Sequence, residues 1–448
     1  MTALPVTAAD RAASAIEAVL ATQWQRIPAF VLDSPPGAGK TGIVERLAVQ
    51  GFARLNERVM IVTLTNEQAF DIARRLGAGF PRIPIHMMVS KQLEVPDEIA
   101  DIASLTLVDS AQRLPSGPMI VIGNAAKWSW LDQHHPLADL QIIDEAYQLP
   151  DYQFLQIAGL AHRHALIGDP GQIAPVIQAE LERWRCDPAG PHVPAPDALV
   201  ARHPGTLRLA LPVSRRLVQD TVSFIQPAFY PDLAFEALTP VRPMGYAVPG
   251  IMPTDLPLDA PVRGQSLTMI ELPAMMAGDV DRAMAGTMVA TVRRVLQRQA
   301  FIVELDGRRV AVTPSMIGLS CAQVAQVAAV RERLWPDLAD VLVETANRFQ
   351  GLERPLMFVQ HPLSGRADAT AFHLDTGRLC VMLSRHSVAC WIFGREGIAS
   401  QLRRYAPVGD RALGIDADPE FTGWRANENL LAQLARQNRI YAVPAELR

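Results

Sequence analysis

A short loop near the N-terminus constrains the fold more strongly than any other feature of the chain. The apolar run Ala29–Leu32 has the length of a buried strand, and it leads into Ser34-Pro-Pro-Gly-Ala-Gly-Lys-Thr41. A helical pattern follows the loop. A strand, a loop that ends in glycine, lysine and threonine, and a helix together form the context of a phosphate-binding loop. The sequence therefore predicts an α/β fold with an anion-binding crevice at the end of a strand.

The residue types of this loop suit nucleotide phosphates and a magnesium ion. Backbone N–H groups of the loop and of the helix start would form an anion cradle. Lys40 would reach the β- and γ-phosphates as a point charge, and Thr41 would hold Mg²⁺. Ser34 stands where the common pattern has glycine, a small departure because the later glycines make the close approach. The residues expected to contact the phosphates are Pro36, Gly37, Ala38, Gly39, Lys40 and Thr41.

Two acidic residues end another apolar run. Asp144 and Glu145 follow Leu140–Ile143, and a carboxylate at the carboxyl end of a parallel strand faces the crevice where ligands bind. Asp144 would help to hold Mg²⁺, and Glu145 would orient and activate the water that attacks the γ-phosphate. A solvated strand end is the plain alternative, since acids are common there.

The rest of the chain alternates short apolar runs with helical patterns in two series, which favours mostly parallel sheets. The 448 residues allow two or three domains. Prolines cluster at 186–205, between the two series, and indicate a linker. No internal repeat is visible. We predict two tandem α/β domains at 1–190 and 207–400, a proline-rich linker at 191–206 and a helical C-terminal tail at 401–448.

Composition excludes several classes of protein. The formal net charge of −4 excludes a wholly basic nucleic-acid coat but not a local basic groove. The four cysteines have no C-x-x-C spacing, so neither a zinc site nor a disulfide framework is predicted. No apolar run approaches the about 18 residues of a membrane span, and no signal-peptide pattern begins the chain. We therefore expect a cytoplasmic protein without membrane contact.

Several ordered blocks resemble the superfamily 1 helicases. Asp144-Glu-Ala-Tyr-Gln148 has the D-E-A-x-Q form of the branch typified by the nonsense-mediated-decay helicase. The resemblance covers about residues 29–394 and implies two RecA-like domains. It also implies ATP and Mg²⁺ as cofactors, and ATP-driven movement on single-stranded nucleic acid with 5′→3′ polarity. The other matching blocks are Thr65-Asn66-x-x-Ala69, Gly168–Gln172, Leu211 to Arg216, Thr313-Pro314, Thr345 to Glu353 and Val381–Arg385.

The resemblance assigns further roles within these blocks. Gln172 would sense the γ-phosphate, and Arg216 and Arg385 would act as arginine fingers that stabilise its charge during hydrolysis. Arg215 takes the place of an aromatic residue that often stacks on adenine. The other expected nucleotide contacts are Gln350, Gly351 and Glu353. The expected nucleic-acid contacts are Thr65, Asn66, Lys127, Trp128 and Thr345.

The segment Asn124-Ala-Ala-Lys-Trp128 leaves two interpretations open. It follows a predicted strand where the family has a strand-contacting block, so Lys127 could meet a phosphate and Trp128 could stack on a base. A helix start whose tryptophans pack in the core is equally consistent. The upstream glutamine that reads adenine in the family is not evident, and Gln23 is a weak candidate.

Two functions stay open at this point. The first is a helicase or translocase on single-stranded nucleic acid, with DNA slightly favoured over RNA and a protein partner that supplies processivity or targeting. The second is a nucleic-acid-stimulated ATPase that clamps a strand or recruits an effector without separating strands. A small-molecule kinase would not explain Gln172, the block from Gln350 to Glu353 or the second α/β series.

Overall fold

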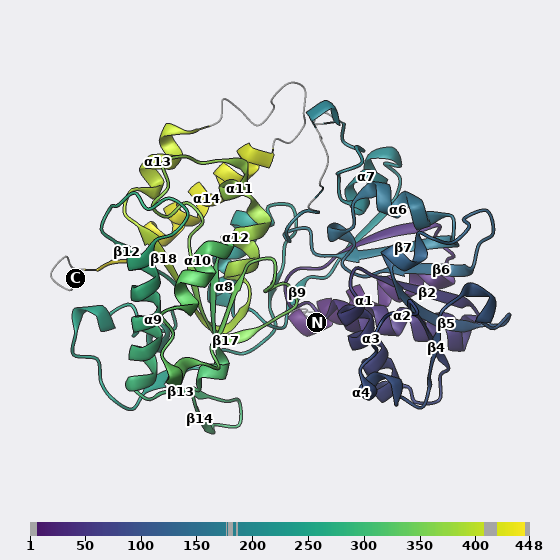
Figure 1. Cartoon of the computed structure of the whole chain (residues 1–448), viewed down its shortest axis with the longest axis horizontal. Coiled ribbons are helices and arrows are strands. Elements are labelled where there is room, and N and C mark those ends of the chain that lie inside the picture. The colour runs from purple at the N-terminus through teal and green to yellow at the C-terminus, as the bar shows by residue number, and fades with distance from the viewer. Residues whose placement is uncertain (1–6, 176, 178–181, 185–186, 407–418, 444–448) are drawn as a thin grey trace, which may run out of the picture. The chain divides into compact units, whose positions relative to one another are not determined.

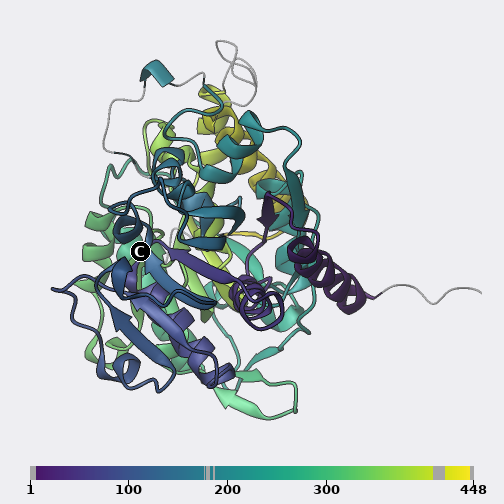
Figure 2. The same ribbon diagram turned by 90° about the vertical axis from the view of Figure 1, so that its right-hand side faces the viewer.

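The chain forms two compact α/β units (Figure 1; turned by 90° in Figure 2). The computed structural model describes residues 7–175, 177, 182–184, 187–406 and 419–443. The N-terminal unit comprises Met1–Pro170 and Ala174–Val213, and the C-terminal unit comprises Gly171–Ile173 and Ser214–Arg448. Cys186, one of the four cysteines, lies outside the described residues.

The N-terminal unit is built on an eight-stranded sheet in the order β4-β3-β5-β2-β6-β7-β1-β8, and every pairing in it is parallel. Its strands are β1 (Ala29–Asp33), β2 (Arg58–Thr63), β3 (Ile85–Met88), β4 (Leu105–Val108), β5 (Met119–Asn124), β6 (Ala138–Ile143), β7 (Ala161–Gly168) and β8 (Leu207–Ala210). Its helices are α1 (Ala8–Trp24), α2 (Lys40–Leu55), α3 (Asn66–Gly79), α4 (Asp97–Ala100), α5 (Ala125–Trp128), α6 (Asp151–Ala158) and α7 (Ala195–Arg202).

Both faces of this sheet are buried, which explains the nearly continuous apolar strands. Phe30 and Leu32 of β1 belong to a core shared with α1, α2 and α3. Val31, which points to the opposite face, belongs to a second core shared with α5, α6 and α7. The strand ends are thereby held rigidly between two layers of helices.

The C-terminal unit is built on a six-stranded parallel sheet in the order β16-β15-β17-β18-β12-β19. Its strands are β12 (Leu267–Leu272), β15 (Ile317–Cys321), β16 (Leu342–Thr345), β17 (Arg354–Gln360), β18 (His386–Arg395) and β19 (Ile440–Ala442). Its helices are α8 (Gln219–Phe229), α9 (Arg282–Gln297), α10 (Val324–Arg331), α11 (Ala371–Leu374), α12 (Thr376–Leu383), α13 (Ile398–Arg404) and α14 (Pro419–Arg436). An antiparallel sheet of β11 (Met244–Tyr246), β13 (Ala300–Val303) and β14 (Arg309–Ala311) is also part of this unit, and β9 (Val213–Ser214) pairs with β10 (Glu236–Ala237).

The two large sheets repeat one topology. Without β3 and β4, the N-terminal order β8-β1-β7-β6-β2-β5 matches β19-β12-β18-β17-β15-β16 strand for strand, and the chain order of the six strands is the same in both. The repeat was invisible in the sequence because the two sets of strands share only their apolar character. The predicted fold class, two tandem α/β domains with mostly parallel sheets, is confirmed.

The predicted linker at 191–206 is wrong. Half of this segment is α7, and β8, which follows it, adds to the edge of the N-terminal sheet beside β1. Pro194 and Pro196 stand at the N-cap and in the first turn of α7, where proline costs no hydrogen bond. The prolines therefore start a helix, and the boundary between the units falls after Val213 rather than at residue 190.

The predicted separate tail at 401–448 is also wrong for its described part. β19 pairs with β12 and so belongs to the C-terminal sheet, while Leu430 and Leu434 of α14 lie in the same core as α8 and α12. Gly423 of α14 is packed so closely that a Cβ there would lie 1.9 Å from the carbonyl oxygen of Leu374. Residues 407–418 and 444–448 of the predicted tail lie outside the described residues.

This packing predicts opposite effects for one substitution at two helical glycines. Gly423→Ala should lower the free energy of unfolding by about 1–3 kcal/mol, because the new methyl group meets backbone. Gly286→Ala in α9 should raise it by about 0.5–1 kcal/mol, because that site is open and alanine favours the helix. Denaturant titration of both variants measures this difference. A stabilising Gly423→Ala would show that α14 is not part of the packed unit.

Candidate functional site

The loop between β1 and α2 has the geometry of an anion cradle. Gly37 and Gly39 adopt left-handed backbone conformations, with φ of 72° and 90°, which residues with a Cβ rarely reach. Gly39 is the N-cap of α2 and provides no side chain to the first N–H groups of the helix. These donors, at the positive end of the helix dipole, therefore face the loop and are suited to an anion.

Lys40 lies among three carboxylates. Its Nζ atom is 2.5 Å from Oε2 of Glu145, and the negative charges of Asp144 and Asp169 also act on it. Burial disfavours the ammonium, but the field of these carboxylates outweighs burial, and the pKa of Lys40 is raised. The structure thus brings the predicted lysine and acidic pair together and adds Asp169, which follows β7 and had no predicted role.

Asp144 has the character of a metal ligand held in a buried site. It is buried at the end of β6, and its Oδ1 accepts a hydrogen bond from the backbone N–H of Glu145 at 3.0 Å. Burial raises the pKa of Asp144 to about 6, against the lowering effect of Lys40. Oxygen atoms of a carboxylate and of the Thr41 hydroxyl are the hard ligands that Mg²⁺ prefers. The residues present therefore fit a magnesium ion bound together with nucleotide phosphates.

Glu145 is held in an unusual backbone conformation. Its φ of 56° is left-handed although it carries a side chain. The next residues form the short helix Ala146–Gln148, and the hydroxyl of Tyr147 donates to Oδ1 of Asp33 at 2.5 Å. Arg208 of β8 donates to the other oxygen of Asp33 at 2.6 Å. This network, of which Asp33 and Tyr147 are buried, ties the turn after β6 to β1, directly before the phosphate loop.

The C-terminal unit gathers residues from three predicted blocks. Arg216 forms an ion pair with Glu353 and donates to the carbonyl oxygen of Ser384 at 3.3 Å. The carbonyl of Arg385 accepts from the backbone N–H of Arg354 at 3.0 Å. Both predicted fingers thus contact the residues that lead into the parallel strands β17 and β18, and Arg385 is buried there.

The other predicted nucleotide contacts occupy loops of the same unit. Gly351 has a φ of 81° and completes the turn between β16 and β17, next to the half-buried Gln350. Arg215 is exposed, and its carbonyl accepts from the hydroxyl of Thr239. Gln172 lies in the segment Gly171–Ile173, whose contacts are with the C-terminal unit. A Cβ at Gly377 of α12 would lie 2.3 Å from the Gln172 carbonyl oxygen.

Four polar residues meet at the ends of β2 and β5. Thr65 caps α3 and accepts from the backbone N–H of Gln68. The side-chain amide of Asn124 donates to Oδ1 of Asn66 at 2.6 Å, and its Oδ1 accepts from the backbone N–H of Lys127. These polar groups share one edge because β2 and β5 are parallel neighbours. Thr345, the remaining predicted strand contact, ends β16 in the other unit.

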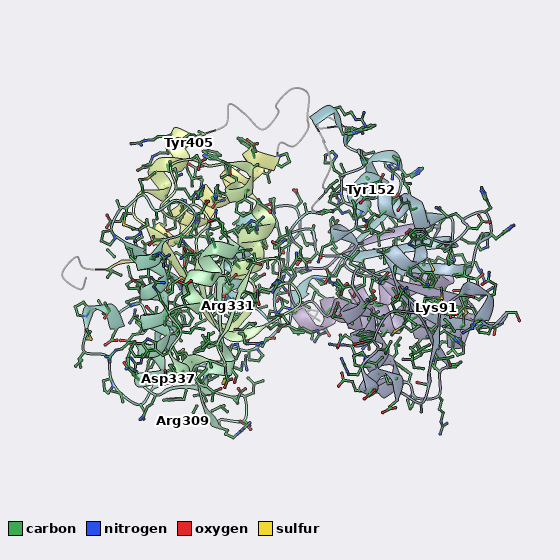
Figure 3. All side chains as sticks on the ribbon, viewed as in Figure 1. Lys91, Tyr152, Arg309, Arg331, Asp337 and Tyr405 are labelled. Carbon is green, nitrogen blue, oxygen red and sulfur yellow. The ribbon has the colours of Figure 1, made fainter. Side chains whose placement is uncertain are left out.

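The lysines differ in their surroundings. Lys127 reaches the carbonyl oxygen of Asp109 with its Nζ atom at 3.0 Å. Lys91, for which the sequence predicts no role, is exposed on the N-terminal unit (Figure 3). Lys40 alone among the three belongs to the acidic cluster.

The structure overturns two candidate contacts. Trp128 is completely buried, and its indole covers Gly123 so closely that a Cβ there would lie 2.9 Å from the ring. The prediction that Trp128 stacks on a base is therefore wrong, because the turn of α5 directs the ring into the core. Trp130, two residues later, is 87% exposed. Gln23 is no adenine reader either, since its side chain is buried and joins the carbonyl of Leu47 to Gln50.

Two further features are absent from the described residues. Among the described residues, no group of three or more His, Cys, Asp or Glu side chains is arranged to hold a metal ion. Across the same parts of the chain, none of the helices combines the length and the apolar character needed to cross a bilayer.

The structure of this chain is similar to several solved helicase structures. The PRRSV helicase shares 15% identity at a TM-score of 0.42, over 85% of this chain and 54% of that chain. Arterivirus nonstructural protein 10, a helicase, shares 15% identity at a TM-score of 0.43, over 85% and 61%. The complex of arterivirus nonstructural protein 10 with DNA shares 14% identity at a TM-score of 0.43, over 86% and 64%. The present chain therefore spans 54% to 64% of the length of these proteins. No protein-family model and no curated protein sequence matches it.

The burial of Trp128 predicts a clear difference between neighbouring tryptophans. Trp128→Ala should lower the free energy of unfolding by about 3–5 kcal/mol, because it empties a large core site. Trp130→Ala should change it by less than about 0.5 kcal/mol. Thermal and denaturant unfolding measure both. Equal stability of the two variants would contradict the buried position of Trp128.

The surroundings of Asp144 predict a pH dependence. A protonated carboxyl does not bind Mg²⁺, so affinity for a magnesium nucleotide should fall about tenfold from about pH 7 to about pH 5, as Asp144 takes up a proton. Titration with a fluorescent nucleotide measures it, and parallel titrations in EDTA correct for protonation of the nucleotide. Asp144→Asn should bind weakly at every pH. An unchanged pH profile in that variant would assign the dependence to another group.

Proposed function

We propose that the protein is an ATP-dependent motor on single-stranded nucleic acid, a helicase or translocase of the superfamily 1 type. One observation carries the proposal. Lys40, Asp144 and Glu145 meet at the carboxyl edge of a parallel sheet, beside a helix start that has no side-chain cap. Phosphoryl transfer requires this combination of anion cradle, metal ligand and base.

In this proposal the residues of the N-terminal unit divide the work of ATP hydrolysis. The loop at 36–39 and the start of α2 hold the phosphates, and Lys40 neutralises their charge. Thr41 and Asp144 hold Mg²⁺, which when bound offsets charge on the β- and γ-phosphate oxygens. Glu145 orients the attacking water and accepts its proton.

The ion pair of Lys40 with Glu145 couples the phosphate-binding lysine to the proposed base. Phosphates compete with Glu145 for the lysine, so binding of a nucleotide separates the pair and frees the carboxylate to act on water. This exchange links nucleotide binding to activation of the base.

We further propose that Arg216 and Arg385 stabilise the charge that develops on the γ-phosphate. Gln172 is proposed to sense whether the γ-phosphate is bound. The shared contacts of Arg216 with Glu353 and Ser384 support a common function for these blocks. A guanidinium suits the task because it stays charged and its planar fork matches phosphate oxygens.

The strand is proposed to contact Thr65, Asn66 and Lys127 on the N-terminal unit and, as a separate contact, Thr345 on the C-terminal unit. Hydroxyl, amide and ammonium groups at adjacent strand ends suit sugar and phosphate contacts. We favour DNA slightly over RNA, movement from 5′ to 3′, and a protein partner that adds processivity or targeting.

One observation favours the second candidate, an ATPase clamp that does not separate strands. Between α3 and β5 the chain adds β3, α4, β4 and the single turn Ala111–Arg113, and β3 and β4 are part of the same sheet as β5. This segment therefore builds no separate domain that could wedge a duplex apart.

The test of the proposal is ATP hydrolysis with and without a strand. Matched single-stranded DNA and RNA should each be added to the purified protein, and we expect at least one to raise the rate several-fold. Equal rates with and without any strand would refute the motor. Displacement of 5′-tailed against 3′-tailed duplexes then separates the candidates, since a clamp binds both without displacing either.

The Lys40–Glu145 pair predicts different results for its two members. Lys40→Ala should abolish hydrolysis and weaken ATP binding, because the phosphates lose their cation. Glu145→Gln should also abolish hydrolysis but bind ATP at least as tightly as the unmodified protein, because the lysine is no longer occupied by a carboxylate. Steady-state hydrolysis and equilibrium binding of ATP measure the two effects. Turnover in either variant would reject the assigned roles.

A further inference from the structure

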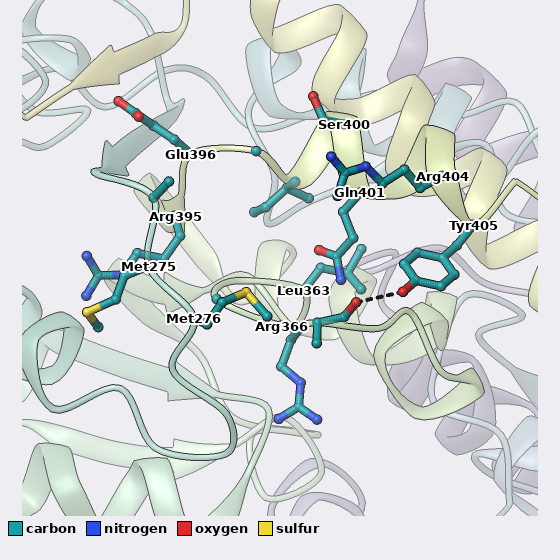
Figure 4. A pocket seen from close by; sticks show the side chains of 15 residues that line it. Met275, Met276, Leu363, Arg366, Arg395, Glu396, Ser400, Gln401, Arg404 and Tyr405 are labelled. Atoms are coloured by element: carbon teal, nitrogen blue, oxygen red, sulfur yellow. Dashed lines mark hydrogen bonds between the residues drawn. The ribbon is translucent and has the colours of Figure 1, made fainter.

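A cavity lies at the carboxyl edge of the C-terminal sheet (Figure 4). Its volume is about 470 Å³, which is within the range of small-molecule sites. The segments that follow β12, β17 and β18 line it, together with α13. The lining includes Met275, Met276, Arg366, Ser400, Arg404 and Tyr405.

The repeated topology relates the position of this cavity to that of the candidate nucleotide site. β12, β17 and β18 occupy the same places in their sheet as β1, β6 and β7 in the other. In the N-terminal unit, those three strands lead into the phosphate loop, the Asp144–Glu145 pair and Asp169. The cavity is therefore the counterpart, within the C-terminal unit, of the candidate nucleotide site.

The counterpart of the phosphate cradle is filled by the protein itself. Asp281, the N-cap of α9, accepts from the backbone N–H of Met284 at 2.8 Å. Arg395 donates to both oxygens of Asp281, at 2.8 and 2.9 Å, and both residues are buried. A carboxylate thus occupies the helix start where a phosphate chain would bind. The cavity cannot take a triphosphate in the manner of the N-terminal site.

The remaining walls offer one separate cationic position and an apolar surface. Arg404 is exposed at the cavity, and within the described part of the chain it has no ion pair, whereas Arg366 is paired with Asp279 at 2.6 Å. Met275 and Met276 are exposed, and the ring of Tyr405 is fixed at the rim by a hydrogen bond from its hydroxyl to the carbonyl of Ala367. Thioether and aromatic groups pack well against a flat ring.

We propose that this cavity binds a single nucleoside monophosphate unit, with its base against Met275, Met276 and Tyr405 and its phosphate on Arg404. The unit is either a free mononucleotide or one nucleotide of a bound strand. The ligand can carry only one phosphate, because the carboxylate of Asp281 occupies the helix start where further phosphates would bind. The site is distinct from the proposed ATPase site and does not depend on its activity.

The experiment uses the full chain carrying Lys40→Ala, which weakens binding at the phosphate loop. AMP, inorganic phosphate and a ten-nucleotide single strand are titrated by calorimetry into this protein and into two versions with a further change. Arg404→Ala should weaken the binding of AMP or of the strand about tenfold, the effect of losing one charged contact. Arg403→Ala is the matched control, because Arg403 is exposed outside the cavity and only donates to the hydroxyl of Ser400 at 3.0 Å, so its loss should leave both affinities unchanged.

The outcomes separate the two sources of the ligand. Loss of AMP binding in Arg404→Ala supports a free mononucleotide, and loss of strand binding alone supports a nucleotide within a strand. Ser400→Trp, which fills the cavity, should reproduce whichever loss is seen. If inorganic phosphate binds as tightly as AMP, the base contributes nothing to affinity, and the proposed contact of the base with Met275, Met276 and Tyr405 is refuted. Equal affinities of Arg404→Ala and Arg403→Ala for AMP and for the strand would refute the site, whether or not the protein hydrolyses ATP.

Discussion

Parallel pairing of β1, β7 and β6 is the constraint on which the candidate nucleotide site depends. Strands that run the same way end at the same edge, so the phosphate loop, Asp169 and Asp144 arrive within reach of one another. The left-handed turns at Gly37 and Gly39 then expose N–H groups at this edge. Neither feature is sufficient alone, because the turns supply donors without charge and the strand ends supply charge without a cradle.

The phosphate loop and the acidic pair could be predicted because their signal is local. A strand, a glycine turn and a lysine at a helix start occupy a few consecutive residues, and Asp144 and Glu145 directly follow an apolar run. The structure places these residues together, and their roles in hydrolysis stay predictions. Asp169 was missed because one acid after a strand is common, and only its position beside Lys40 distinguishes it.

The errors arose where the decisive information is not local. Proline in the first turn of a helix and proline in a linker look alike in a sequence, so α7 could not be recognised from Pro194 and Pro196. Whether Trp128 or Trp130 faces the core depends on the direction of a four-residue helix. The three residues of β19 become a strand only through pairing with β12, which lies about 170 residues earlier in the chain.

The last strand of each sheet also determines when each unit can be completed during synthesis. β8 adds to the N-terminal sheet at residues 207–210, so this unit can close while the second is still incomplete. The C-terminal sheet has to wait for residues 440–442, and until then the outer edge of β12 is unpaired. Gly171–Ile173 waits as well, because the residues that it packs against are made much later. Translation therefore favours an order in which the phosphate-binding half of the chain is finished first.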